Sequence, residues 1–390
     1  MNHAITFDFP LTLEHIDECI DQIDPVKYGK TRNYIDGDVT YLSPYISRWV
    51  VSVAYIARRI LARGYQPHEI EIFLKELLWK EYFWRIGEAR GCDAFLSPLR
   101  YDQEEVKSEY ISVEMIEART QIQALDAAIE TLYATGYIHN HLRMYLSSLS
   151  SNIYRSSWLA WARWMYAHLL DHDIASNMAS WQWGCGVFSS KRYLANQDNI
   201  NQYTHTHQKG TFLDVSYEEI DLLHRDAEWY QACYVSPDLS IYPSIDTYIP
   251  QSTTTQVYTS YTLDPLWSVW VSSDRILLLS PSHFRDYSVS DAVLSWTVAL
   301  ARSIIPGIQV YVGEIKDIQD KYPWQSLRLQ SHYTHRQLPS GISLDPRSHL
   351  VPQVSGYFPS FFAYYQRAKP YLFRLSYDPN TAPRLSAHSK

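Results

Sequence analysis

The stretch "LLDHDIASNMASWQWGCGVF", residues 169–188, carries polar and aromatic side chains at helical spacing. Asp173, Asn177 and Trp181 are four residues apart, so a helix places all three on one face. A carboxylate, an amide and an indole on one buried face need partners for their polar atoms. The spacing predicts either a hydrogen-bonded cluster or a polar ligand with a flat aromatic part, and it leaves both interpretations open.

Two further predicted helices carry similar stripes. The stripes are Glu76, Trp79, Lys80 and Phe83 on residues 67–91, and Asn140, Arg143 and Met144 on residues 140–154. Both segments have apolar positions at helical spacing, and Gly91 provides a stop signal for the first one. The three stripes fit either three separate hydrogen-bonded clusters or convergence on one polar ligand, and the spacing alone leaves both interpretations open.

The composition is that of a globular protein. The chain has 390 residues, of which 46% are hydrophobic and 19% charged, with 32 Tyr and 13 Trp. The formal net charge of -8 argues mildly against a broad nucleic-acid-binding surface but permits a local basic groove. Four scattered cysteines without a CxxC pair indicate reduced thiols rather than a zinc or iron–sulfur site.

The N-terminus lacks the basic and apolar segments of a signal peptide, and no apolar run has the length of a membrane span. These features predict a soluble, cytoplasmic protein that does not bind a membrane. His168 and His172 are four residues apart, but Leu169 stands where an HExxH motif has Glu. No metal is expected.

The sequence predicts a mainly α fold with a small α/β segment at its C-terminal end. We expect a helical domain over 1–235, a linker rich in Ser, Thr and Pro over 236–256, an α/β domain over 257–375 and a flexible tail over 376–390. Helices are expected at 45–64, 67–91, 112–136, 140–154, 156–183 (with a break near Asp171) and 356–369.

Four sequence motifs follow one another along the chain, and their order matches that of a known family. They are "YLSPYIS" (41–47), "ELLWKEYF" (76–83), "ATGYIHNHLRM" (134–144) and "DHDIASNMASWQW" (171–183). Together they resemble the FAD-binding catalytic domain of the photolyase/cryptochrome family, over about residues 25–205. The start of the chain resembles the short bacterial members without an antenna domain. The resemblance implies an all-helical domain with FAD as its cofactor.

The resemblance also implies roles for individual residues. The implied FAD-binding residues are Tyr28, Arg32, Thr40, Leu42, Ser43, Phe73, Arg143, Asp171, Asp173 and Asn177. The implied substrate-pocket residues are Glu76, Trp79, Asn140, Met144 and Trp183, and the implied electron-relay residues are Trp181 and Trp158. Within these sets, Arg143 and Asp171 match an ion pair beside the flavin, and Asn177 matches the residue that faces flavin N5.

Several positions depart from the family pattern. Val39 replaces a hydroxyl residue, while His141 and Lys80 each replace an arginine, which weakens bidentate anion contacts. The outer member of the tryptophan relay falls near Glu105, where no Trp exists. The candidates for that role are Tyr101, Tyr110, Trp161 and Trp164.

The resemblance implies a deoxyribodipyrimidine photo-lyase, a carbon–carbon lyase that splits cyclobutane pyrimidine dimers in DNA with light and reduced FAD. The pocket residues match that type better than the (6-4) type, which has histidines where this chain has Asn140 and Met144. Few phosphate contacts are expected, which favours single-stranded or distorted DNA, where base flipping costs least. The alternative is a cryptochrome-type blue-light photoreceptor without repair activity.

Overall fold

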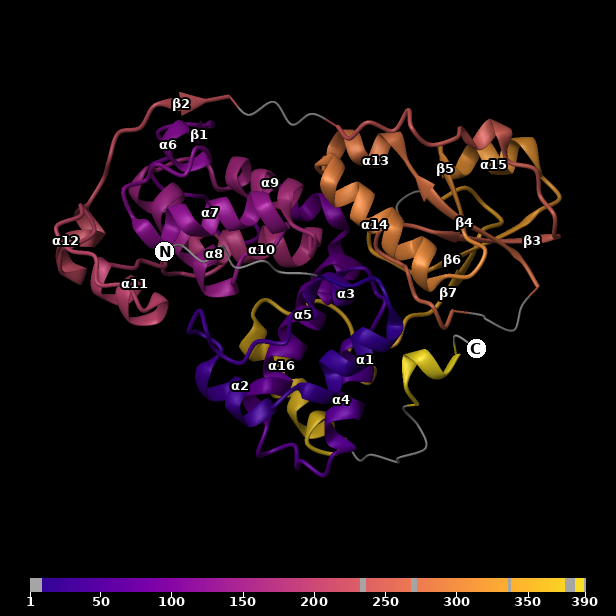
Figure 1. Ribbon diagram of the computed structural model, residues 1–390, viewed down its shortest axis with the longest axis horizontal. Coiled ribbons are helices and arrows are strands. Elements are labelled where there is room, and N and C mark those ends of the chain that lie inside the picture. The colour runs from indigo at the N-terminus through magenta and orange to yellow at the C-terminus, as the bar shows by residue number, and fades with distance from the viewer. Residues whose placement is uncertain (1–8, 232–235, 268–271, 336–337, 376–382, 389–390) are drawn as a thin grey trace. The chain divides into compact units, whose positions relative to one another are not determined.

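The computed structural model describes residues 9–231, 236–267, 272–335, 338–375 and 383–388 (Figure 1). The chain divides into two units. Unit 1 consists of Lys30–Val39 and residues 93–231, and unit 2 of Phe9–Gly29, Thr40–Cys92 and the described residues from 236 onward. These units cut across the boundaries expected from composition, because the N-terminal segments of unit 2 group with the C-terminal half. The boundaries 1–235, 236–256, 257–375 and 376–390 stay predictions.

Unit 1 is built mainly of short helices. They are α6 (Val113–Ile116), α7 (Gln123–Thr135), α8 (Asn140–Ser147), η2 (Ser148–Ile153), α9 (Trp158–His168), α10 (Ile174–Gly184), α11 (Gln197–Thr204) and α12 (Tyr217–Leu222), preceded by η1 (Cys92–Leu96), whose first residue belongs to unit 2. Strands β1 (Ile111–Ser112) and β2 (Trp229–Tyr230) pair antiparallel. The helix expected over 156–183 breaks into α9 and α10 near Asp171, as predicted.

The expected helix over 140–154 continues beyond α8 as the π-helical turn η2. Gly184, at the end of α10, lies against α8, because a Cβ there would sit 2.3 Å from the Ser147 hydroxyl oxygen. No side chain larger than hydrogen fits at this contact, so the glycine allows α8 and α10 to approach closely. The close approach brings α8, which carries Arg143, next to α10, which carries Asn177 and Trp181.

Unit 2 contains the N-terminal helices, a sheet and the helices around it. The helices are α1 (Leu13–Gln22), α2 (Pro25–Thr31), whose last two residues belong to unit 1, α3 (Ser43–Ser47), α4 (Val53–Leu61), α5 (Glu71–Arg90), η3 (Ile245–Thr247), α13 (Pro281–Asp286), α14 (Asp291–Ile304), α15 (Ile315–Lys321), α16 (Phe361–Leu372) and η5 (Leu385–His388). The helix expected over 45–64 is split. Trp49 has φ 58, which ends α3, and the Ser52 hydroxyl accepts from the Tyr55 N–H, which starts α4.

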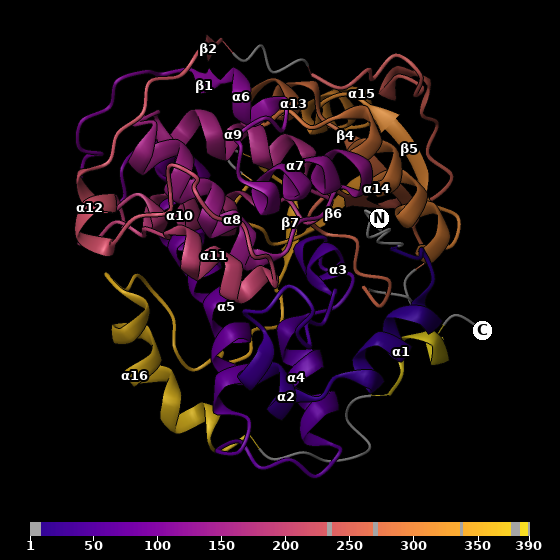
Figure 2. The same cartoon turned by 60° about the vertical axis from the view of Figure 1, so that its left-hand side comes forward.

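The sheet of unit 2 is parallel, with β3 (Thr254–Tyr258) at its centre. Its order is β5 (Gln309–Val312), β4 (Asp274–Leu279), β3, β6 (Ser326–Gln330) and β7 (Ser343–Asp345). The chain builds outward from β3 to β5 and then crosses back to β6, so the strand order reverses between β3 and β6. Helix α14 lies next to the sheet in both views (Figures 1 and 2).

Both faces of the sheet are covered, as parallel sheets require. Ile276 and Leu278 pack on one face with Ile318 of α15, and Leu277 and Leu279 on the other face are buried too. Strands β4 and β5 and helix α14 lie within the α/β segment expected over 257–375, and β3 begins just before it. Strands β6 and β7 and helix α15 were not expected from the sequence.

Helix α16 is attached to α5 through a buried carboxylate. Glu81 of α5 is fully buried and accepts from the Tyr364 hydroxyl at 2.8 Å and from the Val351 N–H at 3.1 Å. A buried charge is costly unless it is hydrogen-bonded, so Glu81 ties α16 and the loop before it to α5. The late helix expected over 356–369 begins five residues later, where Ser360 caps it.

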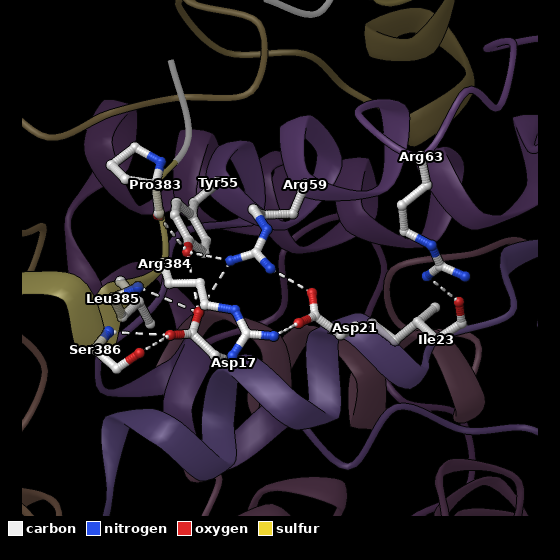
Figure 3. A network of polar contacts seen from close by, with 10 residues as sticks. All are labelled: Asp17, Asp21, Ile23, Tyr55, Arg59, Arg63, Pro383, Arg384, Leu385 and Ser386. Atoms are coloured by element: carbon white, nitrogen blue, oxygen red, sulfur yellow. Dashed lines mark hydrogen bonds and ion pairs between the residues drawn. The ribbon is translucent and has the colours of Figure 1, made fainter. Parts of the chain in front are cut away.

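The last described residues are tied to α1 and α4 through a second buried carboxylate (Figure 3). Asp17 of α1 is fully buried, accepts from the Ser386 N–H and hydroxyl, and pairs with Arg59 of α4 at 3.1 Å. Arg384 also pairs with Asp21. This network ties the last described residues to α1 and α4 within unit 2.

Candidate functional site

The predicted site residues of unit 1 lie on α8, α9 and α10. Leu169 ends α9, and Asp173 caps α10 by accepting from the Ser176 N–H at 2.7 Å. An aspartate at this position satisfies an otherwise unpaired N–H of the first helical turn. Residues 169–173 therefore form the corner between two neighbouring helices, and Asp171 and Asp173 both lie on it, with exposed fractions of 8% and 1%.

Arg143 and Asp171 form the ion pair that the resemblance implies. The Arg143 Nη2 lies 2.9 Å from the Asp171 Oδ2, and its Nε donates to the Ile138 carbonyl. The other carboxylate oxygen, Asp171 Oδ1, is buried and has no hydrogen-bond partner among the residues that the structure describes. A buried unpaired carboxylate oxygen calls for a donor, and a ligand N–H would supply one.

Asn177 lies one turn along α10 from Asp173. Its Nδ2 donates to the Ala162 carbonyl of α9 at 2.7 Å, which fixes the orientation of the amide. The Oδ1 is therefore the atom of the amide that is left to accept a hydrogen bond. Nearby, the Ser176 hydroxyl is buried without a partner in the described part of the chain.

The two predicted relay residues are buried, with exposed fractions of 3% for Trp181 and 4% for Trp158. Two candidates for the outer relay position, Trp161 and Trp164, are in ring contact with a centroid distance of 5.4 Å. The row continues to Tyr133 of α7, whose hydroxyl accepts from the Trp164 indole N–H at 3.2 Å. Tyr133 is 45% exposed, so the row of rings reaches the surface.

The predicted substrate-side residues of unit 1 are more accessible. Trp183 is 38% exposed and its ring centroid lies 6.1 Å from that of Tyr193. Asn140, the first residue of α8, is exposed, and Met144 one turn later is half-buried. Arg32, which belongs to the predicted cofactor-binding set, is also half-buried in unit 1.

The remaining predicted cofactor-binding residues belong to unit 2. Phe73 is buried and contacts Tyr28 edge to face, with ring centroids 5.3 Å apart. The Thr40 hydroxyl accepts from the Leu42 N–H at 3.3 Å, and Ser43 is the first residue of α3. Between them Tyr41 has φ 52, a left-handed backbone that is uncommon for tyrosine and often found at ligand sites.

Glu76 and Trp79 lie about one turn apart on α5, and both are half-buried. One face of the Trp79 ring is covered by Phe361 of α16, with ring centroids 3.8 Å apart and an interplanar angle of 11°. The Phe83 ring is also close to Trp79, at 5.4 Å. The side chain expected to stack on a base is thus already stacked on a phenylalanine of the same unit.

His141 and Lys80, which replace arginines of the family pattern, each have a defined contact in the structure. The His141 ring nitrogens lie 2.8 Å from the Asn33 carbonyl and 3.1 Å from the Tyr193 hydroxyl, and burial lowers the pKa of His141. It joins Lys30–Val39 to α8 as a neutral group rather than as a cation. Lys80 donates to the Ser47 hydroxyl at 3.0 Å.

Sequence reasoning missed a structural role for Gln182, between the two tryptophans of "WQW". The side chain is fully buried, accepts from the Leu99 N–H at 2.7 Å and donates to the Ser97 carbonyl at 3.1 Å. It holds residues 95–99 against α10. It also missed Phe361, although the cluster of aromatic residues in "GYFPSFFAYYQRAK" marks a helix with an aromatic face.

The polar atoms that have no partner at this site are suited to form hydrogen bonds with a flavin. An isoalloxazine ring offers both N–H donors and carbonyl acceptors, and Asp171 Oδ1, Ser176 Oγ and Asn177 Oδ1 provide buried or constrained polar partners. Among the described residues there is no group of three or more His, Cys, Asp or Glu arranged to hold a metal ion. Nor does any helix in that part of the chain have the length and apolarity needed to span a bilayer.

Comparison with known proteins identifies the class of this domain. Residues 73–226 match the family described as "FAD binding domain of DNA photolyase". This segment is therefore similar to the FAD-binding domain of the photolyase/cryptochrome family, and FAD is the cofactor that the match supports. Tyr28, Arg32, Thr40, Leu42 and Ser43 lie before the matched segment.

Named relatives include both repair enzymes and cryptochromes. The chain is 27% identical over 184 residues to a deoxyribodipyrimidine photo-lyase of Agrobacterium fabrum, covering 43% of this chain and 37% of that protein. It is 28% identical over 174 residues to a chloroplastic/mitochondrial cryptochrome DASH of Oryza sativa, covering 42% of this chain and 30% of that one. The chain thus spans about a third of the length of these relatives.

A solved structure, the cryptochrome of Synechocystis sp. PCC6803, aligns with a TM-score of 0.43 and 19% identity. The alignment covers 52% of this chain and 45% of that one.

Proposed function

We propose that this chain is a light-driven repair enzyme that splits cyclobutane pyrimidine dimers in DNA, with a preference for single-stranded DNA. The observation that carries the proposal is the unpaired, buried Asp171 Oδ1 next to the Arg143 ion pair, within a segment that matches a photolyase FAD-binding domain. Bound, reduced FAD would supply a light-excited electron to the dimer, and the electron would return after the ring has opened.

The protein side chains would bind and orient rather than react. Asp171 and Asp173 would accept from the cofactor, and Asn177 would present its amide oxygen, because its Nδ2 is held by Ala162. An amide there adds no negative charge next to a reduced, anionic ring. Tyr28, Arg32, Thr40, Leu42, Ser43 and Phe73 complete the proposed cofactor-binding set.

Substrate binding would fall to the aromatic and polar residues of α5, α8 and α10. Trp79 and Trp183 would stack on the extruded bases, while Glu76 and Asn140 would bond to base edges and Met144 would pack beside them. Trp181 and Trp158 would carry electrons to the flavin. The cytoplasm is the proposed location.

The test uses an oligonucleotide with one cyclobutane thymine dimer, in single-stranded and duplex forms. Purified protein should carry about one FAD per chain, as the proposal requires one site. After reduction it should restore the thymines under blue light and leave them dimerised in the dark, as followed by chromatography. Absence of light-dependent repair of both strand forms, with FAD bound and reduced, would reject the repair function.

A cryptochrome-type photoreceptor is the second candidate. Two observations favour it: the relatives include DASH cryptochromes at similar identity, and Phe361 already covers one face of Trp79. Light-induced change in the flavin spectrum without any dimer repair would support this alternative.

A further inference from the structure

Phe361 of α16 covers a ring face of Trp79 on α5, and both residues belong to unit 2. Their ring centroids are 3.8 Å apart and the planes differ by 11°. That spacing is a van der Waals contact, so nothing can lie between the two rings. A base inserted there would need the rings about 7 Å apart, which is twice one contact distance.

From this contact we infer that Phe361 is a gate on the base-stacking face of Trp79, which an extruded base displaces when single-stranded DNA binds. The inference rests on the proposed function, because it takes Trp79 as a base-stacking residue. Phe361 occupies the position that a base would take, so it lowers the affinity for DNA and selects ligands that stack better than a phenyl ring.

The attachment of α16 allows this movement. Phe361 is the first residue of the helix, just after the cap residue Ser360. The helix is fixed further along, where Tyr364 donates to Glu81 at 2.8 Å and Tyr365 donates to Glu71. The backbone on both sides of Phe361 is attached to α5, because Tyr82 also donates to the Phe358 carbonyl at 3.1 Å. The movement is therefore a rotation of the Phe361 side chain about its own bonds.

Charge near the gate suits a nucleic acid. The Lys75 and Lys369 ammonium groups lie 4.6 and 5.6 Å from the centroid of the Tyr365 ring, one turn from Phe361. Glu71 pairs with both lysines, at 2.8 and 3.5 Å. Around the Tyr365 ring the two lysines outnumber Glu71 by one charge, and their flexible side chains can reach a phosphate that follows the base.

The test compares Phe361→Ala with Phe362→Ala in the full-length protein. Phe362 is the next residue in the same helix and is 69% exposed, so its replacement is a matched control. Hydroxyl-radical footprinting with mass spectrometry reports the accessibility of Trp79 without DNA or flavin. Binding is measured with a single-stranded oligonucleotide that carries one thymine dimer.

Phe361→Ala should increase labelling of Trp79 and raise the affinity for the oligonucleotide about tenfold, which corresponds to about 1.4 kcal/mol. Phe362→Ala should change neither quantity. Adding Trp79→Ala to Phe361→Ala should abolish the gain in affinity.

Three outcomes overturn the inference, and they can be told apart. Equal affinity of the parent and Phe361→Ala, with measurable binding by both, overturns the gate alone. No binding by either protein overturns the gate and the proposed function together. Unchanged labelling of Trp79 in Phe361→Ala also overturns the gate, whatever the DNA affinity.

Discussion

The amide of Asn177 bridges two helices, and this contact determines how substitutions there behave. Its Nδ2 donates to the Ala162 carbonyl at 2.7 Å, and the residue is buried. A carboxylate in its place would lose the donor and set a negative charge against a carbonyl oxygen. A buried acceptor without a partner costs about 1–3 kcal/mol.

We therefore expect Asn177→Asp to lower the free energy of unfolding at pH 7 by about 1–3 kcal/mol, measured by urea titration. Asn140→Asp is the control, because Asn140 is exposed at the first position of α8, where a negative charge is favourable. Equal stability of Asn177→Asp and the parent protein would mean that the Asn177–Ala162 contact is absent in solution.

The contacts of some site residues can be predicted from the sequence, and the contacts of others cannot. The Arg143–Asp171 pair follows from a motif, because both partners sit at fixed places in matched strings. Gln182 and His141 do not, since their partners Leu99 and Asn33 are distant in sequence. The placement of Trp79 against Phe361 could not be predicted for the same reason.

At the scale of elements, α9 carries aromatic residues every three positions. Trp158, Trp161 and Trp164 follow one another along the helix, and the last donates to Tyr133 of α7. Burial raises the pKa of Tyr133, so its hydroxyl stays protonated at neutral pH. Under the proposed function, this row would be an electron path that ends at the surface and does not need a Trp at Glu105.

Tyr133→Phe should slow the light-driven reduction of bound FAD several-fold in the presence of an external thiol, because it replaces the exposed end of this row with a ring that is harder to oxidise. The absorbance spectrum during illumination measures this rate, and electron paramagnetic resonance identifies any tyrosyl radical. Tyr217→Phe is the control, because Tyr217 is 50% exposed and is not a relay candidate. The same rate and the same radical signal in parent and Tyr133→Phe would exclude the path.

Elements with strong local signals were predicted well. The break between α9 and α10 follows from the short polar run that ends in a capping Asp173, and α5 ends at Gly91 as expected. Helix α4 begins later than expected, because the left-handed backbone at Trp49 interrupts an otherwise periodic stretch. Strands β6 and β7 are short and lie between loops, so no periodicity marks them.

At the scale of the whole molecule, unit 2 contains a group of buried histidines beyond the carboxyl ends of β4 and β6. The His283 Nε2 lies 2.9 Å from the Tyr261 hydroxyl, and the His332 ring stacks on the Tyr261 ring at 5.0 Å. Tyr333, next in sequence, lies against α5, since a Cβ on Gly87 would sit 2.6 Å from its ring. The cluster thus lies where the sheet meets the N-terminal helices.

Burial keeps these histidines neutral. It lowers the pKa of His283 to about 4 and that of His335 to about 3, and it lowers the pKa of His332 as well. The positive charge of Arg347 also disfavours protonation of His332 and His335, whereas Asp286 and Glu314 favour it at His283. The unfolded chain protonates its histidines near pH 6.5.

Between about pH 6.5 and 4 the unfolded state therefore binds more protons than the folded state, so stability rises with pH and is lost as pH falls through this window. Within this window, each histidine that is protonated only in the unfolded state lowers the free energy of unfolding by about 1.4 kcal/mol for every pH unit of acidification. We expect urea titrations to show this loss from pH 6.5 to 4.5, with a smaller slope in His335→Gln. His68→Gln, at an exposed position, should keep the parent slope. Identical slopes for the parent protein and His335→Gln would show that His335 is protonated equally in the folded and unfolded states.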